Sequence, residues 1–219
     1  MTESQLVTTA PFAYQRVAKG ADDAPTIVAL HGSGADEMSM LPLAQAIMPN
    51  AGVIAPRGRI DQNGERRWFR KVTPTRFVQS SIRSEAAAFA GFLRDLSRDG
   101  ILDLRSTVFL GYSNGGNLVH ALMLLHPGLV RRAILLRCMP VLFWPPRPDL
   151  SGAEALIVAG EDDQTYGRFT PKLARLLERR GAAVAVCSVP AGHMFGEDDI
   201  ELARKWCRSR ALENDRVSA

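Results

Sequence analysis

Short apolar runs recur along the whole chain and alternate with stretches of helical periodicity. Several runs are rich in β-branched residues and apolar at successive positions, which is typical of parallel strands covered on both faces. Because strands and helices alternate, the pattern predicts an α/β fold: a doubly wound, mainly parallel sheet with helices on both faces and right-handed crossovers. The expected strands span residues 12–18, 26–31, 52–56, 106–112, 132–137, 155–160 and 183–189.

Helical spacing of apolar residues predicts four helices between and after these strands. One follows residue 112, and one extends through residues 82–96 and ends before Gly100, which suits a helix C-terminus. Another begins near Thr170, with Pro171 in its first turn, and stops at Gly181. The last spans about residues 198–212.

Two connections break this alternation. Residues 57–75 and 138–153 are long and irregular, and the second is too rich in proline to form one regular helix. Long loops in compact α/β domains are commonly functional or disordered. The length of 219 residues suits one domain over 1–219, with both irregular loops near its active site.

Charge and cysteine content narrow the functional classes. The formal net charge is +4, and basic residues crowd the segment 57–76. That segment has no nucleic-acid-binding motif, so a solvated loop is the better interpretation than a nucleic-acid site, although an acidic substrate or a membrane headgroup stays open. The three cysteines, Cys138, Cys187 and Cys207, are widely spaced, which indicates buried thiols rather than a disulfide framework or a zinc site.

The sequence also argues against several kinds of targeting signal and partner. Neither a secretory leader nor a run of membrane-spanning length is present, so we expect a cytoplasmic protein with no stable membrane insertion. We expect neither a metal nor an organic cofactor, because the histidines form no local ligand cluster. A homodimer is compatible with the sequence, which gives no direct sign of one.

The pentapeptide "GYSNG", residues 111–115, lies between an expected strand and an expected helix. This is the context that a G-x-S-x-G nucleophile elbow requires, with Ser113 held at the carboxyl end of the sheet. Gly111 and Gly115 would let the strand and the helix approach closely. Alone, the motif does not distinguish an elbow from a turn whose serine only caps the helix.

A serine nucleophile needs a general base, normally histidine. Of the four histidines, His120 lies within an expected helix, His126 at its end, and His31 at the end of an early strand, where structural roles are favoured. His193, in "AGHMFG" after the last strand, has the position and chain order of a base. A loop histidine without a catalytic role is the less favoured interpretation.

The acid of such a site comes between serine and histidine, after a strand. The loop "EDDQ" supplies Glu161, Asp162 and Asp163, and spacing alone does not choose among them. One or two of them are expected to form a solvated acidic turn.

The negative charge that develops on the substrate oxygen needs preorganised amide donors. The backbone N–H of Asn114 follows the nucleophile, and "HGSG", residues 31–34, comes after an early strand. Together they predict an oxyanion hole formed by the Asn114 and Ser33 amides.

The stretches "LHGSGADE", "APRG", "RRWF", "GYSNGGNL", "AGEDD" and "AGHMF" together resemble the phospholipase/carboxylesterase family of α/β-hydrolases, which includes acyl-protein thioesterases. The resemblance extends over about residues 25–207. It implies Ser113 as nucleophile, His193 as base, and Asp163 as acid through a G-x-x-D pattern on Gly160 and Asp163. It also implies oxyanion donors at Ser33 and Asn114. The chain departs from the family at Asn114, where glutamine is common, and at Gln164, where proline follows the acid.

The implied activity is hydrolysis of carboxylic esters through an acyl-enzyme, and the apolar residues of the loops favour small or medium apolar acyl or aryl groups. Lysophospholipids and acyl thioesters are alternative substrates, and a non-catalytic binding protein is an alternative of another class. A dienelactone hydrolase would have cysteine at position 113. Apolar loop residues predict a substrate pocket, although half or more of such residues commonly pack in the core: Trp68, Phe69, Met139, Leu142, Phe143, Trp144, Met194 and Phe195.

Overall fold

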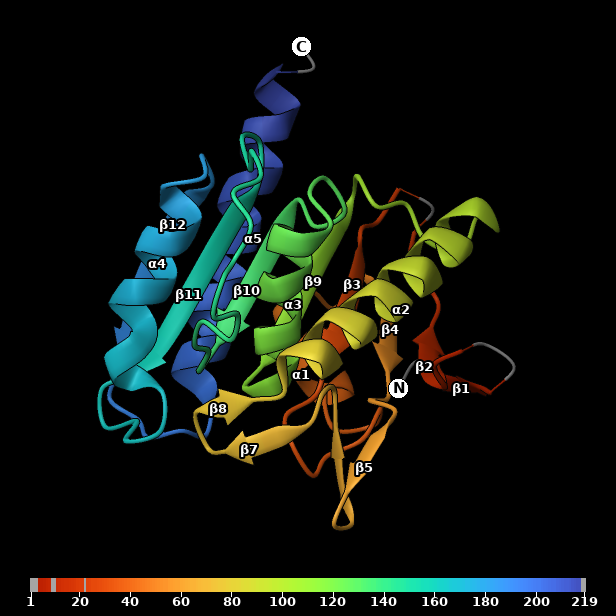
Figure 1. Ribbon diagram of the computed structural model, residues 1–219. Coiled ribbons are helices and arrows are strands. Elements are labelled where there is room, and N and C mark those ends of the chain that lie inside the picture. Colours follow the sequence, from red (N-terminus) through yellow and green to blue (C-terminus); the bar gives the residue numbers. More distant parts are fainter. Residues whose placement is uncertain (1–3, 9–10, 22, 218–219) are drawn as a thin grey trace.

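A mainly parallel eight-stranded sheet forms the centre of the protein, in a computed structural model that describes residues 4–8, 11–21 and 23–217 (Figure 1). The strand order is β1-β2-β4-β3-β9-β10-β11-β12. The pairs β1–β2 and β2–β4 are antiparallel, and all other pairs are parallel. The strands are β1 (Ser4–Val7), β2 (Tyr14–Val17), β3 (Thr26–Leu30), β4 (Gly52–Pro56), β9 (Thr107–Tyr112), β10 (Arg132–Leu136), β11 (Glu154–Gly160) and β12 (Ala183–Val189).

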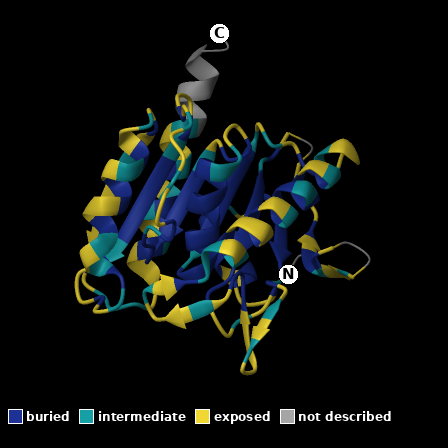
Figure 2. Ribbon diagram, in the orientation of Figure 1, coloured by how far each residue is buried: buried dark blue, intermediate teal, exposed yellow. Residues whose placement is uncertain are grey.

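Helices cover both faces of this sheet, as the sequence predicts (Figure 1). One face carries α2 (Gln79–Arg98), α3 (Asn114–Leu125) and α4 (Thr170–Glu178), the last preceded by the 3₁₀ turn η1 (Gly167–Phe169). The other carries α1 (Leu41–Ile47) and α5 (Glu197–Val217). Burial follows this layering, because the central strands are buried on both sides while the outer helix surfaces are exposed (Figure 2).

The predicted fold class and all seven predicted strands are confirmed. The first expected strand, 12–18, is β2, and it runs antiparallel to its neighbours. The sequence did not predict the edge strand β1, the helix α1 or the turn η1, each of seven residues or fewer, nor the short strands within residues 60–77. Both ends of the predicted domain, residues 1–3 and 218–219, lie outside the described residues.

Residues 57–75 are more regular than the predicted irregular loop. Residues 60–77 form two hairpins, β5 (Ile60–Gln62) with β6 (Glu65–Arg67), and β7 (Lys71–Thr73) with β8 (Arg76–Phe77), so the second ends just beyond the predicted loop. Asn63 and Gly64 both have positive φ, 58° and 80°, as the type I′ turn of a two-residue hairpin requires. Strands of two or three residues are too short to show alternation, so only the Asn-Gly pair could have signalled the first hairpin.

Residues 138–153 form no helix or strand, in agreement with the prediction. The cysteines are all free, but only Cys138 is buried; Cys187 and Cys207 are half-buried, which corrects the expectation of three buried thiols. None of the described helices combines the length and the apolar character needed to span a bilayer.

Candidate active site

Ser113 is the single residue between β9 and α3. Its φ of 50° and ψ of −113° place it in a conformation that residues other than glycine rarely adopt. The surrounding backbone holds it there: the Ser113 N–H donates to Leu136 O at 2.8 Å, and Ser113 O accepts from the Asn117 N–H at 2.9 Å. A sharp, strained turn of this kind is the geometry of a nucleophile elbow.

Glycine is required on both sides of this turn. A Cβ at Gly111 would collide with the backbone of Gly116, on the first turn of α3. A Cβ at Gly115 would collide with the carbonyl oxygens of Leu30 and His31, where β3 ends. The close approach of strand and helix that the two glycines predict is therefore present.

Three distant side chains meet at the carboxyl edge of the sheet. His193 Nε2 lies 2.9 Å from Ser113 Oγ, and His193 Nδ1 lies 2.9 Å from Asp163 Oδ2. Because a carboxylate only accepts, Nδ1 carries the proton of a neutral ring, and Nε2 is left to accept from the serine hydroxyl. Ser113 is 7% exposed and the His193 side chain is 29% exposed, so the serine is largely enclosed while the histidine is partly open to solvent.

The acidic loop after β11 presents only one of its three carboxylates to this histidine. Asp163 is buried, and its Oδ1 accepts from the Thr165 and Tyr166 N–H groups at 2.8 and 3.0 Å. Glu161 and Asp162 are exposed. Their backbone N–H groups donate to Val189 O and Ala191 O, which fixes this loop against the segment that carries His193.

The two expected oxyanion donors lie on α3 and on the turn after β3. Asn114 is the first residue of α3, so its N–H belongs to the helix turn that has no carbonyl partner within the helix. Its side-chain Oδ1 accepts from the Trp68 N–H at 2.8 Å. Ser33 is exposed in the turn after β3, next to Gly32, where an added Cβ would lie 3.7 Å from Ser113 Cβ.

His31 stabilises that turn rather than taking part in proton transfer. Its Nδ1–H donates to Gly32 O at 2.6 Å, and its Nε2 accepts from the Gly58 N–H at 3.0 Å. Burial lowers the pKa of His31, which keeps the ring neutral. Trp68 adds a third hydrogen bond to this turn, in which its indole N–H donates to His31 O at 2.8 Å.

Two tyrosines enclose the His193 ring. Tyr166 packs edge-on against it, with ring centroids 5.2 Å apart, and the Tyr112 ring lies 5.6 Å away. Burial raises the pKa of Tyr166 to about 12, so its hydroxyl stays protonated and donates to Pro74 O at 3.2 Å. The Tyr112 hydroxyl donates to His193 O at 3.2 Å. Sequence reasoning did not single out either tyrosine, because neither lies in a motif that identifies it.

A buried ion pair holds the loop that carries His193, and sequence reasoning missed it as well. The Arg137 and Asp199 side chains are 0% and 1% exposed and are joined by hydrogen bonds of 2.7 and 3.0 Å. Arg137 also donates to Gly192 O at 2.8 Å and to Met194 O at 3.2 Å, the two residues flanking His193. An arginine at the end of an apolar strand gives no sequence signal of such a role.

The other two histidines lie away from the triad. His120 is fully buried in α3, where its Nε2 accepts from the Val141 N–H at 3.4 Å, and burial lowers its pKa to about 3. His126 is the residue after α3, as predicted, and is half-buried.

The predicted pocket residues divide into two groups. Trp68, Phe69 and Met139 are 1%, 0% and 4% exposed and pack in the core, and Met139 also lines a groove beside Phe143. Leu142 is buried with them. Met194 is exposed beside the Tyr112 hydroxyl, and Phe195 packs edge-on against the Tyr112 ring at 4.9 Å. Phe143 and Trp144 are exposed on the 138–153 segment.

Metal ligation is not indicated in the part of the chain that the structure describes. There, no three His, Cys, Asp or Glu side chains are grouped so as to hold an ion.

Comparison with known proteins agrees with this geometry. A structure of a carboxylesterase from Mesorhizobium loti is 48% identical, with a TM-score of 0.90 over 94% of this chain and 98% of that one. The Bacillus cereus carboxylesterase is 26% identical, with a TM-score of 0.87 over 90% and 94% of the two chains. The Bacillus subtilis (strain 168) protein MhqD is 27% identical over 189 residues, which cover 86% of this chain and 94% of MhqD.

A family model covers the larger part of the chain. It matches residues 13–154, from β2 to the start of β11, and so includes the elbow and the "HGSG" turn. The chain therefore belongs to the phospholipase/carboxylesterase family of α/β-hydrolases.

Proposed function

We propose that the protein is a serine carboxylesterase that hydrolyses esters with small or medium apolar acyl or aryl groups. The observation that carries this proposal is the continuous chain of contacts from Ser113 Oγ through His193 to Asp163, with both contacts at 2.9 Å. A serine hydroxyl within hydrogen-bond reach of an oriented histidine is the arrangement that activates it as a nucleophile.

In the first half of the reaction, Ser113 Oγ attacks the ester carbonyl carbon while its proton moves to His193 Nε2. The carbonyl π electrons move to the oxygen, which becomes an oxyanion facing the Asn114 and Ser33 amides. When the tetrahedral intermediate collapses, the bond to the leaving oxygen breaks and His193 returns the proton to the departing alcohol. The acyl group remains on Ser113.

In the second half, water replaces the alcohol. His193 Nε2 takes a proton from the water as its oxygen attacks the acyl carbon, and the bond to Ser113 Oγ then breaks. The proton passes from His193 to Ser113, which restores the enzyme and releases the carboxylic acid. Asp163 stabilises the imidazolium that forms in both halves and keeps the ring in the required tautomer.

The relatives support an ester as the substrate, because the Mesorhizobium loti and Bacillus cereus structures are both described as carboxylesterases. The surroundings of Ser113 support an apolar acyl or aryl group, since Tyr112, Tyr166 and Met194 lie around the histidine. Neighbouring Cys138 is also buried, with its Sγ 4.0 Å from Ser113 O.

The decisive experiment compares the wild type with two matched pairs of variants on p-nitrophenyl esters of increasing acyl length. Ser113→Ala is expected to abolish turnover and labelling by an organophosphonate, whereas Ser39→Ala, in an exposed turn, is expected to retain both. Asp163→Asn is expected to lower kcat by roughly 10⁴-fold, because the amide favours the wrong tautomer. Asp162→Asn is expected to leave kcat within about twofold of wild type, because that side chain is exposed.

Lysophospholipid and acyl-thioester substrates belong in the same panel. If either is hydrolysed faster than the simple esters, it becomes the preferred substrate class, and the proposed mechanism is unchanged. If the folded Ser113→Ala protein kept full esterase activity, the mechanism would be wrong. If the wild type turned over no substrate and was not labelled, a non-catalytic binding role would replace the proposal.

A further inference from the structure

Two aromatic side chains project from the 138–153 segment. Phe143 and Trp144 are 50% and 81% exposed, and their rings pack edge-on with centroids 6.2 Å apart. The backbone that carries them is anchored on α2, because Gln79 accepts from the Phe143 N–H at 2.9 Å and donates to Val141 O at 2.9 Å. These hydrogen bonds hold the segment so that the two rings face outward. Adjacent exposed aromatic side chains are typical of a surface that binds a partner or a membrane.

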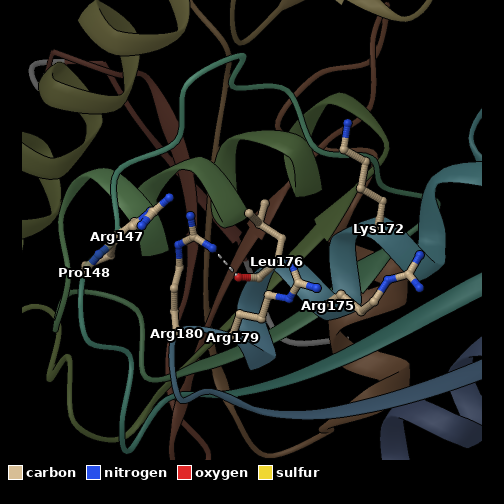
Figure 3. Close-up of a pocket in the computed structure, with 7 residues that line it drawn as sticks. All are labelled: Arg147, Pro148, Lys172, Arg175, Leu176, Arg179 and Arg180. Carbon is tan, nitrogen blue, oxygen red and sulfur yellow. Dashed lines mark hydrogen bonds between the residues drawn. The ribbon is translucent and has the colours of Figure 1, made fainter.

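A strongly basic depression of about 630 Å³ lies next to this pair, between the 138–153 segment and α4 (Figure 3). Lys172 and Arg175 lie on α4 and Arg179 is its C-cap, and their spacings of three and four place them on one face, while Leu173 and Leu177 are buried. Arg147 and Arg180 complete the lining together with Pro148 and Leu176 (Figure 3).

The aromatic pair and the basic depression form one surface, which we call the basic-aromatic face: Arg83, Phe143, Trp144, Arg147, Lys172, Arg175 and Arg179. Lys172 lines both the depression and an adjoining groove of about 370 Å³ bounded by Phe143, Trp144 and Phe169. On the other side of the pair, an Arg83 Nη2–H donates to Trp144 O at 3.2 Å. The aromatic rings therefore lie between cations on both sides.

The charge on this face is not neutralised within the described residues. Among those residues, Arg147, Lys172, Arg175 and Arg179 form no ion pair, and no acidic side chain lines the depression. The acidic residues nearest in sequence are Glu178, on α4 but outside the lining, and Asp149, which accepts from Ser151. Like charges three and four residues apart destabilise a helix, so an external anion would be favourable here.

We propose that the basic-aromatic face binds the surface of an anionic phospholipid bilayer. Exposed Trp and Phe side chains suit the boundary between headgroups and acyl chains. Lys and Arg side chains around them would contact the lipid phosphates and add electrostatic attraction to the negative surface. A single small anion would contact the cations of the depression but would leave the two aromatic rings unused, so a lipid surface accounts for both features.

Such binding would bring the catalytic edge close to the lipid. Phe169 borders the groove, and its N–H donates to Tyr166 O at 2.8 Å, while the Tyr166 ring packs against His193. The bound protein would thus present the candidate site beside the membrane surface without inserting a helix. The binding surface does not include Ser113, Asp163 or His193, so this proposal is independent of the proposed function.

Tryptophan fluorescence gives a direct test, with the catalytically blocked Ser113→Ala full-length chain. Trp68 and Trp206 are 1% and 7% exposed, so an emission shift on adding vesicles reports mainly on Trp144. We expect a blue shift and co-sedimentation with vesicles of equimolar phosphatidylcholine and phosphatidylglycerol, and both should weaken as salt is added. Vesicles of phosphatidylcholine alone should bind much less.

Charge variants show whether vesicle binding depends on the cations of this face or only on the net charge of the protein. Lys172→Gln with Arg175→Gln should lower vesicle partitioning by about fivefold for each charge removed. Arg98→Gln with Arg105→Gln removes the same charge from exposed positions at the amino ends of the strands and should change partitioning less than twofold. Phe143→Ala with Trp144→Ala should also lower partitioning.

Several results would overturn the proposal. These are equal binding to both vesicle types, equal losses in the two charge variants, or no vesicle binding while inorganic phosphate or pyrophosphate binds to the Lys172 and Arg175 site. An esterase panel without turnover but with vesicle binding would reject the proposed function alone. Turnover without vesicle binding would reject the lipid surface alone.

Discussion

At the scale of single residues, the backbone of Ser113 combines a functional position with local strain. Its φ and ψ are close to those of the first central residue of a type II′ turn, a position that glycine dominates. Such conformations cost about 1–3 kcal/mol for other residues. Glycine would relieve that strain but would add about 0.5–1 kcal/mol of chain entropy to the cost of folding.

We therefore expect Ser113→Gly to be more stable than Ser113→Ala by about 1 kcal/mol, or roughly 2–4 °C in melting temperature. Both variants lose the hydroxyl and should be inactive, so calorimetry is the readout. Asn63→Gly is the control. Asn63 also has positive φ, but asparagine is a favoured residue in this turn type, so we expect little change in melting temperature. Equal melting of the Gly and Ala variants at 113 would show that the elbow stores no strain.

The choice among Glu161, Asp162 and Asp163 shows what spacing cannot decide. All three lie on one short loop after β11, so each comes between serine and histidine in the chain. The difference lies in side-chain direction: Asp163 turns inward, where two backbone N–H groups and His193 meet it, while its neighbours face solvent. Such direction depends on the local turn and is not visible in residue order.

At the scale of elements, the Arg137–Asp199 pair joins the end of β10 to the first turn of α5 and holds the His193 loop between them. Asp199 also accepts from the Gly196 N–H at 2.9 Å, just before α5. Removing one partner of a buried ion pair leaves an uncompensated charge and costs about 3–5 kcal/mol. We expect Asp199→Asn to lower both stability and kcat, whereas Asp95→Asn, in an exposed pair with Arg98, should cost less than about 1 kcal/mol.

A double variant separates positioning from stability. Arg137→Met with Asp199→Leu removes both charges, so it should regain much of the stability that either single change loses. It cannot restore the hydrogen bonds to Gly192 O and Met194 O, so kcat should stay low while KM changes little. Wild-type kcat in the stable double variant would show that the pair has only a structural role.

Long elements were predictable from sequence and short ones were not. The parallel strands are apolar on both faces, and α2 and α4 carry regular buried stripes, so hydrophobic periodicity identified them. The strands β5–β8 have two or three residues each, which is less than the period needed for a signal. Arg137 was missed for another reason: its role comes from side-chain contacts with Gly192, Met194 and Asp199, which lie more than 50 residues away in the sequence.

At the scale of the whole molecule, buried neutral histidines couple folding to pH. His120 has its pKa lowered by burial from 6.5 to about 3, so the unfolded chain binds a proton that the folded chain excludes over that interval. The contribution of His120 to stability is therefore fully present above pH 6.5 and is lost as the pH drops toward 3. His31 acts in the same direction, because burial lowers its pKa too.

For His120 alone, the loss between pH 7.5 and pH 5.0 should be about 2 kcal/mol, from 1.36 kcal/mol for each unit below 6.5. His120→Gln removes the titrating group but keeps an acceptor for the Val141 N–H. Its free energy of unfolding should therefore depend less on pH by that amount, even if its stability at pH 7.5 is lower. Urea unfolding at the two pH values measures the difference. The half-buried His126 is the control, and His126→Gln should flatten the dependence much less. An unchanged pH dependence in His120→Gln would mean that the folded protein accommodates a protonated His120.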